Sequence, residues 1–143
     1  MHLKITWIAS LFFLISILLA GCNATAPPYE LASRDTLPPE VQTAPQVVRE
    51  SYRFAVANPD VLTQLPCYCG CGSMGHTSNY SCYIAGQNPD GTLIFDRHAL
   101  GCSICVDITQ DAMHMLDEGR SLSEIRTYID QTYSAFGPST FSP

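Results

Sequence analysis

Lysine is almost absent from this chain, and basic side chains are scarce as a group. The single lysine is Lys4, so the sequence after residue 22 carries six arginines against thirteen acidic residues, a net charge of −7. Such a surface repels phosphate backbones and anionic lipid headgroups. The composition therefore argues against a nucleic-acid partner and against electrostatic attachment to a membrane. The negative charge is compatible with binding cations, although the solubility that surface charge provides is enough to explain most of these carboxylates.

Recognisable signatures of catalysis are also missing. No arrangement of serine, histidine and carboxylate and no pair of acids stands out as an enzyme motif, and no internal repeat is visible. Cys102-Ser103-Ile104-Cys105 lacks the surrounding βαβ pattern of a thioredoxin-like motif. It is not a haem attachment motif either, because Val106 stands where that motif requires histidine. We therefore expect a binding protein and not an enzyme, with thiol-disulfide exchange as the minority hypothesis.

The long apolar run of the chain lies at its beginning. Ile5 to Leu19 is almost unbroken and ends in Leu19-Ala20-Gly21-Cys22. This length and the small residues at its end are typical of a secretory signal over residues 1–21, not of a membrane span. The last four residues resemble the lipobox of bacterial lipoproteins, which implies lipidation of Cys22 and cleavage before it. The alternative is an uncleaved signal-anchor helix, and both place the domain at the cell membrane, facing the extracytoplasmic side.

The remaining chain is long enough for one small domain with a modest core. Residues 22–42 contain two Pro-Pro pairs and few clustered apolar residues, which predicts a lipidated cysteine followed by an extended tether. Residues 43–136 are predicted to form the domain, and residues 137–143 a frayed end. The first helix is expected to start near Thr43 as its N-cap and to stop by Asn58, before Pro59.

The pattern predicts an α+β fold that is mainly helical. Three glycines make the segment after Cys67 an irregular loop, and Asn88-Pro89-Asp90-Gly91 is a turn signal between two short apolar segments, 82–85 and 92–95. A short β-hairpin is the natural interpretation. Apolar residues at helical spacing then predict two C-terminal helices. The first ends at Gly119, and the second begins with the capping box Ser121-Leu122-Ser123-Glu124.

Six cysteines follow Cys22, in two clusters and one single position. Cys67, Cys69 and Cys71 lie within five residues, Cys82 follows, and Cys102 and Cys105 lie at a predicted helix start. Cysteines two residues apart rarely pair with each other, because a disulfide needs a suitable Cα separation and direction. They converge on a metal more easily when Gly70 lets the backbone fold around it. Helix N-terminal amides favour the thiolate at Cys102 and Cys105.

Three hypotheses remain open for these thiols. A thiolate-rich site selects soft or borderline cations, of which copper is our first expectation and zinc the alternative. Six thiols exceed the four that one zinc ion needs, which favours a polynuclear Cu(I) site or four ligands plus one disulfide. The competing hypothesis is three structural disulfides, which suits a small exported domain and needs no cofactor. Thiol-disulfide exchange at Cys102 and Cys105 is the third.

Histidine and methionine add possible ligands near the cysteines. His76 and His98 each neighbour a cysteine element without an obvious packing role, so both are candidates. His114 is three turns from Cys102 and is expected on the surface. Met113 and Met115 point in different directions on a helix, so at least one of them is expected to fill the core.

The residues around the cysteines carry a resemblance to a known family. Leu65 to Gly72, then Gly75-His76, Asn79 and Cys82, and later His98 to Ile108, resemble the PCYCGC-motif lipoproteins of bacteria. The likeness runs from the first predicted helix to Tyr133. It implies an exported lipoprotein, and it places His76 and His98 in the same recurring motifs as the cysteines.

The sequence therefore predicts a lipid-anchored extracytoplasmic protein that binds a soft metal for storage or delivery. Its partners would be the membrane, through the anchor at Cys22, and a metal-donor or metal-acceptor protein. The predicted metal ligands, with the histidines as additional or supporting groups, are Cys67, Cys69, Cys71, Cys82, Cys102, Cys105, His76 and His98.

Overall fold

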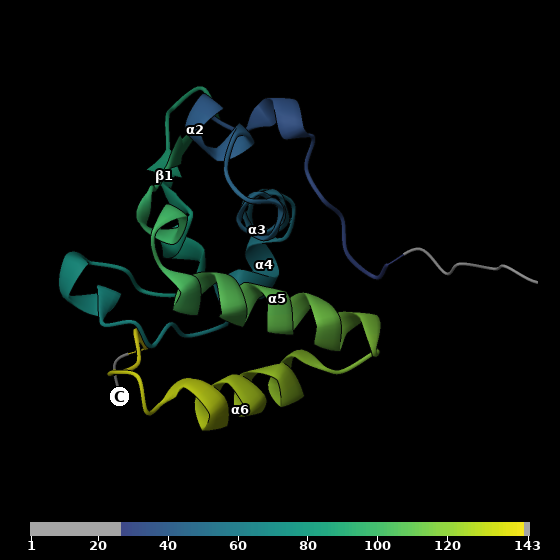
Figure 1. The fold of residues 1–143 in the computed structure, drawn as a ribbon, viewed down its shortest axis with the longest axis vertical. Helices are drawn as coiled ribbons and strands as arrows, with labels where there is room; N and C mark the ends of the chain where they lie inside the picture. The colour runs from purple at the N-terminus through teal and green to yellow at the C-terminus, as the bar shows by residue number, and fades with distance from the viewer. Residues whose placement is uncertain (1–26, 142–143) are drawn as a thin grey trace, which may run out of the picture.

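The computed structural model describes residues 27–141, so the predicted signal segment and Cys22 lie outside the described residues. Helices and one two-stranded hairpin make up the fold, which confirms the α+β, mainly helical prediction (Figure 1). The helices are α2 (Pro39–Gln42), α3 (Gln46–Ala57), α4 (Pro59–Leu62), α5 (Ser103–Asp117) and α6 (Leu122–Tyr133). The hairpin joins β1 (Ile84–Gln87) and β2 (Leu93–Phe95), and four 3-10 turns occupy Arg34–Thr36, Cys71–Met74, Tyr80–Cys82 and His98–Leu100. Within residues 27–141, no helix is both long and apolar enough to cross a membrane.

Helix α3 begins later than its sequence suggested. Thr43 ends the short α2, and Pro45 directly precedes α3 with an extended backbone. The helix ends at Ala57, as predicted from Pro59, and the Asn58 side chain donates a hydrogen bond to the Phe54 carbonyl at 2.9 Å. The Phe54 carbonyl also accepts the Asn58 backbone amide at 2.8 Å, so Asn58 closes the end of the helix with both groups.

The hairpin forms where the turn signal predicted it, but its first strand starts two residues later. Ile84 pairs with Phe95 and Gln87 with Leu93, with a bulge between Ile84 and Gly86. Cys82 belongs instead to the 3-10 turn before the strand, and it is fully buried. The turn therefore directs this cysteine into the interior, beside α5.

The C-terminal helix pair is confirmed. Helix α5 ends before Gly119, whose φ of 75° lies in the left-handed region that glycine adopts without strain. The Ser121 side chain accepts the Glu124 amide, and the Glu124 side chain returns to the Ser121 amide, which completes the predicted capping box. Ile125 and Ile129 of α6 are fully buried, and the two helices run side by side (Figure 1).

The packed part of the chain begins well before residue 43. Leu37 and Val41 are buried in the core, and the Tyr29 ring lies edge-on to Phe54 with the centroids 5.1 Å apart. The Ala32 amide donates to the Arg53 carbonyl of α3 at 3.1 Å, and the Arg53 side chain donates to the Ala32 carbonyl at 2.6 Å. The expected extended tether is therefore corrected for the segment from Tyr29 onward. Single apolar side chains between prolines anchor it, and such isolated contacts leave no periodic pattern in the sequence.

The C-terminal segment is packed as well, where fraying was expected. The Thr140 amide donates to the Cys67 carbonyl at 3.0 Å, and the Cys67 amide donates to the Thr140 hydroxyl at 2.8 Å. Gly137 lies so close to the loop that a Cβ there would meet the Tyr68 carbonyl oxygen at 2.8 Å. These contacts involve backbone groups, which no side-chain periodicity reveals. The end of the chain thus closes over the cysteine loop.

Candidate metal centre

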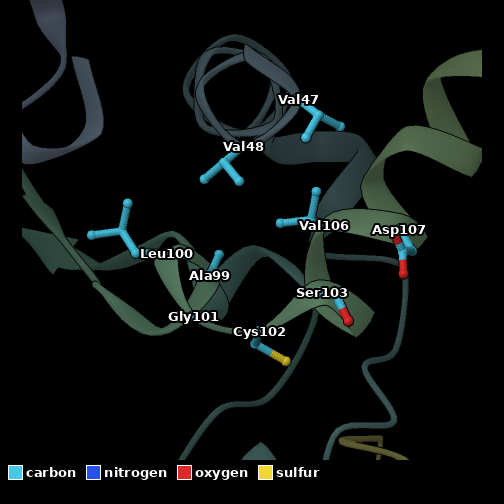
Figure 2. Close-up of a pocket in the computed structure, with 9 residues that line it drawn as sticks. All are labelled: Val47, Val48, Ala99, Leu100, Gly101, Cys102, Ser103, Val106 and Asp107. Carbon is cyan, nitrogen blue, oxygen red and sulfur yellow. The ribbon is translucent and has the colours of Figure 1, made fainter. Parts of the chain in front are cut away.

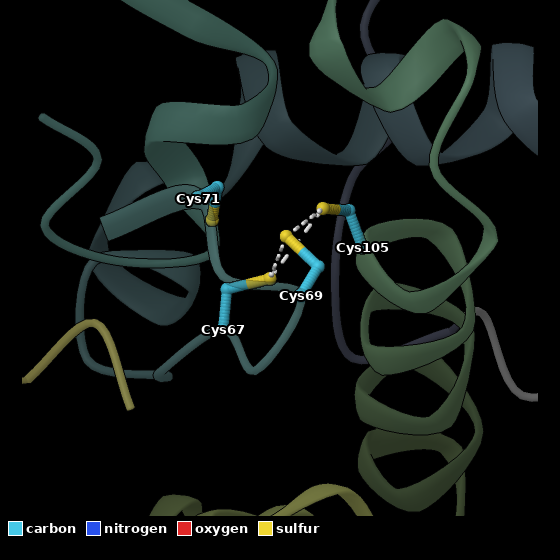
Figure 3. A group of neighbouring side chains, drawn as sticks. All are labelled: Cys67, Cys69, Cys71 and Cys105. Carbon is cyan, nitrogen blue, oxygen red and sulfur yellow. Dashed lines mark hydrogen bonds between the residues drawn. The ribbon is translucent and has the colours of Figure 1, made fainter. Parts of the chain in front are cut away.

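Six sulfurs from three separate segments converge in the interior. The loop 67–71 supplies three, the 3-10 turn before β1 supplies Cys82, and the start of α5 supplies Cys102 and Cys105. Cys105 lies at the centre, with its Sγ 3.1 Å from Cys82, 3.4 Å from Cys67 and 3.6 Å from Cys69. Figure 3 shows the sulfurs of Cys67, Cys69 and Cys105 facing one another across the gap between the loop and α5.

The other donors complete a continuous cluster. The Sγ atoms of Cys67 and Cys69 are 3.5 Å apart, and those of Cys71 and Cys82 are 3.8 Å apart. The Nε2 atom of His98 lies 3.3 Å from the Cys69 sulfur. Three overlapping groups of four donors each fit within 4.8 Å: Cys67, Cys69, Cys71 and Cys105; Cys69, His98, Cys102 and Cys105; and Cys71, Cys82, His98 and Cys105.

Two glycines shape the loop that brings Cys71 inward. Gly70 has φ 83° and Gly75 has φ 92°, on either side of the 3-10 turn Cys71–Met74. Side chains other than glycine reach these values only with strain. The turn buries Cys71 and leaves Met74 exposed. The local reversal that the glycines allow is therefore what folds three closely spaced cysteines around one point.

Cys102 and Cys105 enter the cluster from different backbone positions. Cys102 is the extended cap residue that precedes α5, and Cys105 lies in the first turn. Both sulfurs belong to the donor group that also contains Cys69 and His98. Cys102 has no helical conformation, yet both cysteines reach the same site.

A buried polar network holds Cys105 against the loop, and the sequence reasoning missed its members as site residues. The Cys105 carbonyl accepts hydrogen bonds from the Asn79 amide at 3.1 Å and the Tyr83 hydroxyl at 2.8 Å. Thr109, one turn along α5, donates to the Asn79 side-chain oxygen at 2.8 Å and lies 2.7 Å from the Tyr83 hydroxyl. All three side chains are fully buried. The only sequence signal was the position of Asn79 within the recurring motif.

Asp96 organises the two predicted histidines. Its side chain accepts the His98 backbone amide at 2.7 Å and lies 3.4 Å from Nε2 of His76. The two imidazole rings meet edge-on with their centroids 5.1 Å apart. His76 belongs to none of the donor groups found in the described residues, and its Nδ1 is buried without a hydrogen-bond partner. The structure thus brings seven of the eight predicted ligands together, and His76 lies one layer outside them.

His114 lies on the surface, and Met113 and Met115 lie in the core. His114 is exposed and lies 3.3 Å from Glu118, as expected of a surface residue. Met113 and Met115 are both buried, which satisfies the expectation that at least one fills the core. Within the described residues, His114 belongs to none of the donor groups.

Burial controls the protonation of the thiols. Hydrogen bonding from Cys105 and Cys82 lowers the pKa of Cys67 well below its usual range. Desolvation raises the pKa of Cys69 and Cys71, and hydrogen bonding to Cys67 raises that of Cys105. One thiolate among neutral thiols is what this buried cluster supports by itself. Further thiolates need a compensating cation, since a low-dielectric site penalises uncompensated charge.

No disulfide forms among the six cysteines between residues 27 and 141, and each is a free thiol. The shortest sulfur separation is 3.1 Å, between Cys82 and Cys105, well beyond the bond length of about 2.05 Å. The structure therefore does not contain the three structural disulfides of the competing hypothesis among the described residues.

An apolar groove of about 310 Å³ borders the start of α5 (Figure 2). Val47 and Val48 of α3 face Leu100 and Val106 across it, and Cys102 lies at its edge. In Figure 2 the Cys102 sulfur points away from the two valines. The groove therefore adds no ligand to the cluster.

Comparisons with known proteins give one match. A family model described as "Protein of unknown function with PCYCGC motif" matches residues 11–143. No curated protein and no solved structure matches this chain. The comparisons therefore supply a family but neither a reaction nor a ligand.

Proposed function

This chain belongs to the PCYCGC-motif family of proteins of unknown function, and we propose that it binds a soft metal ion through its cysteine cluster. The ion we propose first is Cu(I), held for storage or delivery and not for turnover. The observation that carries the proposal is the convergence of six free thiols and one imidazole in three overlapping donor groups that are largely buried.

The spacing of the sulfurs suits a metal better than it suits an ordinary core. Tetrahedral ligands at about 2.3 Å from a zinc ion lie about 3.8 Å from one another. The sulfurs in direct contact lie between 3.1 Å, for Cys82 and Cys105, and 3.8 Å, for Cys71 and Cys82, and all donors of a group lie within 4.8 Å of one another. Small adjustments of side chains would therefore make room for an ion without moving the backbone.

The donor set favours copper over zinc. Thiolate sulfur selects Cu(I) and zinc over hard cations such as Mg²⁺ and Ca²⁺. One zinc ion needs only four ligands. Here the Cys105 sulfur belongs to all three overlapping donor groups, so more than one ion would share it. Shared sulfurs of this kind are suited to a polynuclear Cu(I)-thiolate cluster. Zinc remains the second candidate, since each donor group has four members.

The surroundings of the histidines also support a ligand role for His98. Its ring approaches Cys69, and Asp96 fixes its backbone. His76 packs on the His98 ring and lies near Asp96, so it would orient the ligand from outside the donor set.

The proposed location is extracytoplasmic, with a lipid anchor on Cys22. Its support is the apolar run that ends in Leu19-Ala20-Gly21-Cys22. A metal-donor or metal-acceptor protein is the proposed partner. The net negative charge of the domain would assist approach of a cation or of a basic partner.

Elemental analysis combined with a thiol count tests the metal proposal. The full chain is purified without oxygen, and bound copper and zinc are measured beside the thiols titratable after denaturation. We expect at least about one equivalent of metal per chain together with cluster thiols that all titrate. No metal and almost no free thiol would instead support structural disulfides. Reversible oxidation of Cys102 and Cys105 without metal would support thiol-disulfide exchange.

Serine variants assign the metal to the cluster. Cys69→Ser and Cys105→Ser each remove a sulfur that belongs to more than one donor group, so we expect loss of most bound metal with the helical circular dichroism signal retained. Ser123→Ala, an exposed change on α6, is the matched control and should keep the wild-type metal content. Unchanged metal content in both cysteine variants would contradict the proposal.

A further inference from the structure

The cluster is not buried evenly. Cys67, Cys82 and Cys105 have no exposed surface and Cys71 is 1% exposed, whereas Cys69, Cys102 and His98 are each partly exposed. We infer that the cluster has two ends: a buried end that retains metal, and a solvent-facing end at which a thiol-bearing partner protein exchanges it. This inference rests on the proposed metal-binding function.

Two of the three donor groups divide along the same line, and the third, Cys71, Cys82, His98 and Cys105, joins His98 to buried thiols. The group Cys69, His98, Cys102 and Cys105 contains all three partly exposed donors. The group Cys67, Cys69, Cys71 and Cys105 contains three buried thiols. Cys69 and Cys105 belong to both groups. An ion at the solvent-facing end would therefore share two sulfurs with an ion at the buried end, which gives a path between the two positions without release to water.

The backbone is held firmly at the buried end. Both backbone groups of Cys67 are hydrogen-bonded to Thr140, and the Cys105 carbonyl accepts from Asn79 and Tyr83. These bonds lie in the interior, where breaking them would leave buried polar groups unpaired. Ligands at this end therefore hold their positions when the occupancy of the site changes.

The solvent-facing end is supported more lightly. Cys102 has an extended backbone, makes no side-chain capping bond and follows Gly101, around which a Cβ would find open space. His98 stands in a 3-10 turn of three residues, where Asp96 holds its backbone amide but its ring remains partly exposed. These two ligands can separate from the ion with little disturbance of the core. They are the ligands at which exchange begins.

The exchange step needs a soft ligand on the partner. A thiolate sulfur of the partner forms a bond to the Cu(I) ion while the bond from Cys102 to that ion breaks. The Cys102 thiolate that is released takes a proton from water. No electron is transferred, and the ion keeps its number of ligands. The partner is therefore a protein that presents an accessible cysteine thiolate, since harder ligands would not compete with the cluster for Cu(I).

Removal of copper by a competing chelator tests the division. The full chain is loaded with Cu(I) without oxygen, and transfer to bathocuproine disulfonate is followed by absorbance in a stopped-flow instrument. We expect a fast phase from the solvent-facing end and a slow phase from the buried end. Cys102→Ser should remove the fast phase or slow it by about tenfold, which corresponds to about 1.4 kcal/mol. The slow phase should keep its rate.

Cys71→Ser is the matched variant, because it removes a buried thiol from the other donor group. It should reduce the slow phase and keep the fast one, whereas His98→Gln should slow the fast phase as Cys102→Ser does and also reduce the slow phase, because His98 belongs to a donor group with Cys71 and Cys82 as well. A single phase in the wild-type chain, or a fast phase unchanged by Cys102→Ser, would overturn the two-ended cluster and leave metal binding standing. A chain that takes up no Cu(I) would overturn both proposals.

Discussion

Cys105 is the residue on which the site depends most. Its sulfur belongs to all three donor groups, and its carbonyl is tied to Asn79 and Tyr83 from the segment that follows the cysteine loop. One residue thus joins α5 to the loop through both its side chain and its backbone. Loss of a hydrogen bond to the Cys105 carbonyl would therefore shift the position of the Cys105 sulfur.

Asn79→Ala tests this connection. The change removes a donor to the Cys105 carbonyl and an acceptor from Thr109 in a fully buried position, so we expect a loss of about 1–3 kcal/mol in the free energy of unfolding. Denaturant unfolding of the metal-free protein measures it. Copper affinity should fall as well, because supporting hydrogen bonds typically change metal affinity by about 10–100-fold.

Gln131→Ala removes an exposed amide on α6 and should leave both quantities unchanged. If Asn79→Ala lowered stability without weakening copper binding, the network would be a packing feature and not a support of the site.

At the scale of single residues, the cysteines were predictable because spacing and composition single them out. The supporting residues were not. Asn79 is followed by Tyr80 and Ser81 in a polar segment, and nothing in that segment distinguishes a buried amide from an exposed one. Burial of a polar side chain depends on partners far away in sequence, here Thr109 and Cys105, which only the folded chain brings close.

At the scale of elements, the cysteine loop depends on its backbone conformation more than on side-chain packing. Gly70 and Gly75 bracket the 3-10 turn that buries Cys71, and both adopt positive φ. A Cβ at either position would meet no neighbouring atom within 4 Å. Substitution there therefore isolates the conformational cost, free of steric clash.

Gly70→Ala should destabilise the loop by about 1–2 kcal/mol, the cost of holding an alanine in the left-handed region. We expect weaker copper binding, measured by competition with a chelator, because the strain displaces Cys71. Gly86→Ala in β1 is the control, since a Cβ there also meets open space and φ is not positive. Equal effects of the two changes would mean that the positive φ at Gly70 is unimportant for the site.

The elements with strong local signals were predicted well. Pro59, the Asn88–Gly91 turn, Gly119 and the Ser121 capping box act within a few residues, and each was found where it was expected. The segments 29–42 and 137–141 were not predicted, because long-range contacts hold them. Thr140 pairs with the backbone of Cys67 from the far end of the chain, and no local pattern encodes that pairing.

At the scale of the whole molecule, metal binding at the cluster would change both the number of bound protons and the stability of the fold. The domain has a small core, and its sulfur cluster lies where the loop, the hairpin and α5 meet. An ion bound there joins these segments in the folded state only. Binding should therefore stabilise the whole fold and not the loop alone.

Copper should raise the midpoint of thermal unfolding, and the rise should grow with pH. At a free Cu(I) concentration about 100 times the dissociation constant, the stabilisation is about 2.7 kcal/mol. For a domain of this size that amounts to a shift of about 10 °C or more. Differential scanning calorimetry without oxygen, with and without Cu(I), measures the shift.

The pH dependence follows from the thiols. The pKa values of Cys69, Cys71 and Cys105 are raised in the metal-free protein, so these thiols are protonated at neutral pH and must lose protons to bind copper. Raising the pH lowers the free energy needed to deprotonate these thiols. The copper-induced shift of the unfolding midpoint should therefore be larger at pH 8 than at pH 6. Proton release on copper addition, measured in a weakly buffered solution, should accompany binding. A shift that is independent of pH, without proton release, would mean that the ion binds groups other than these thiols.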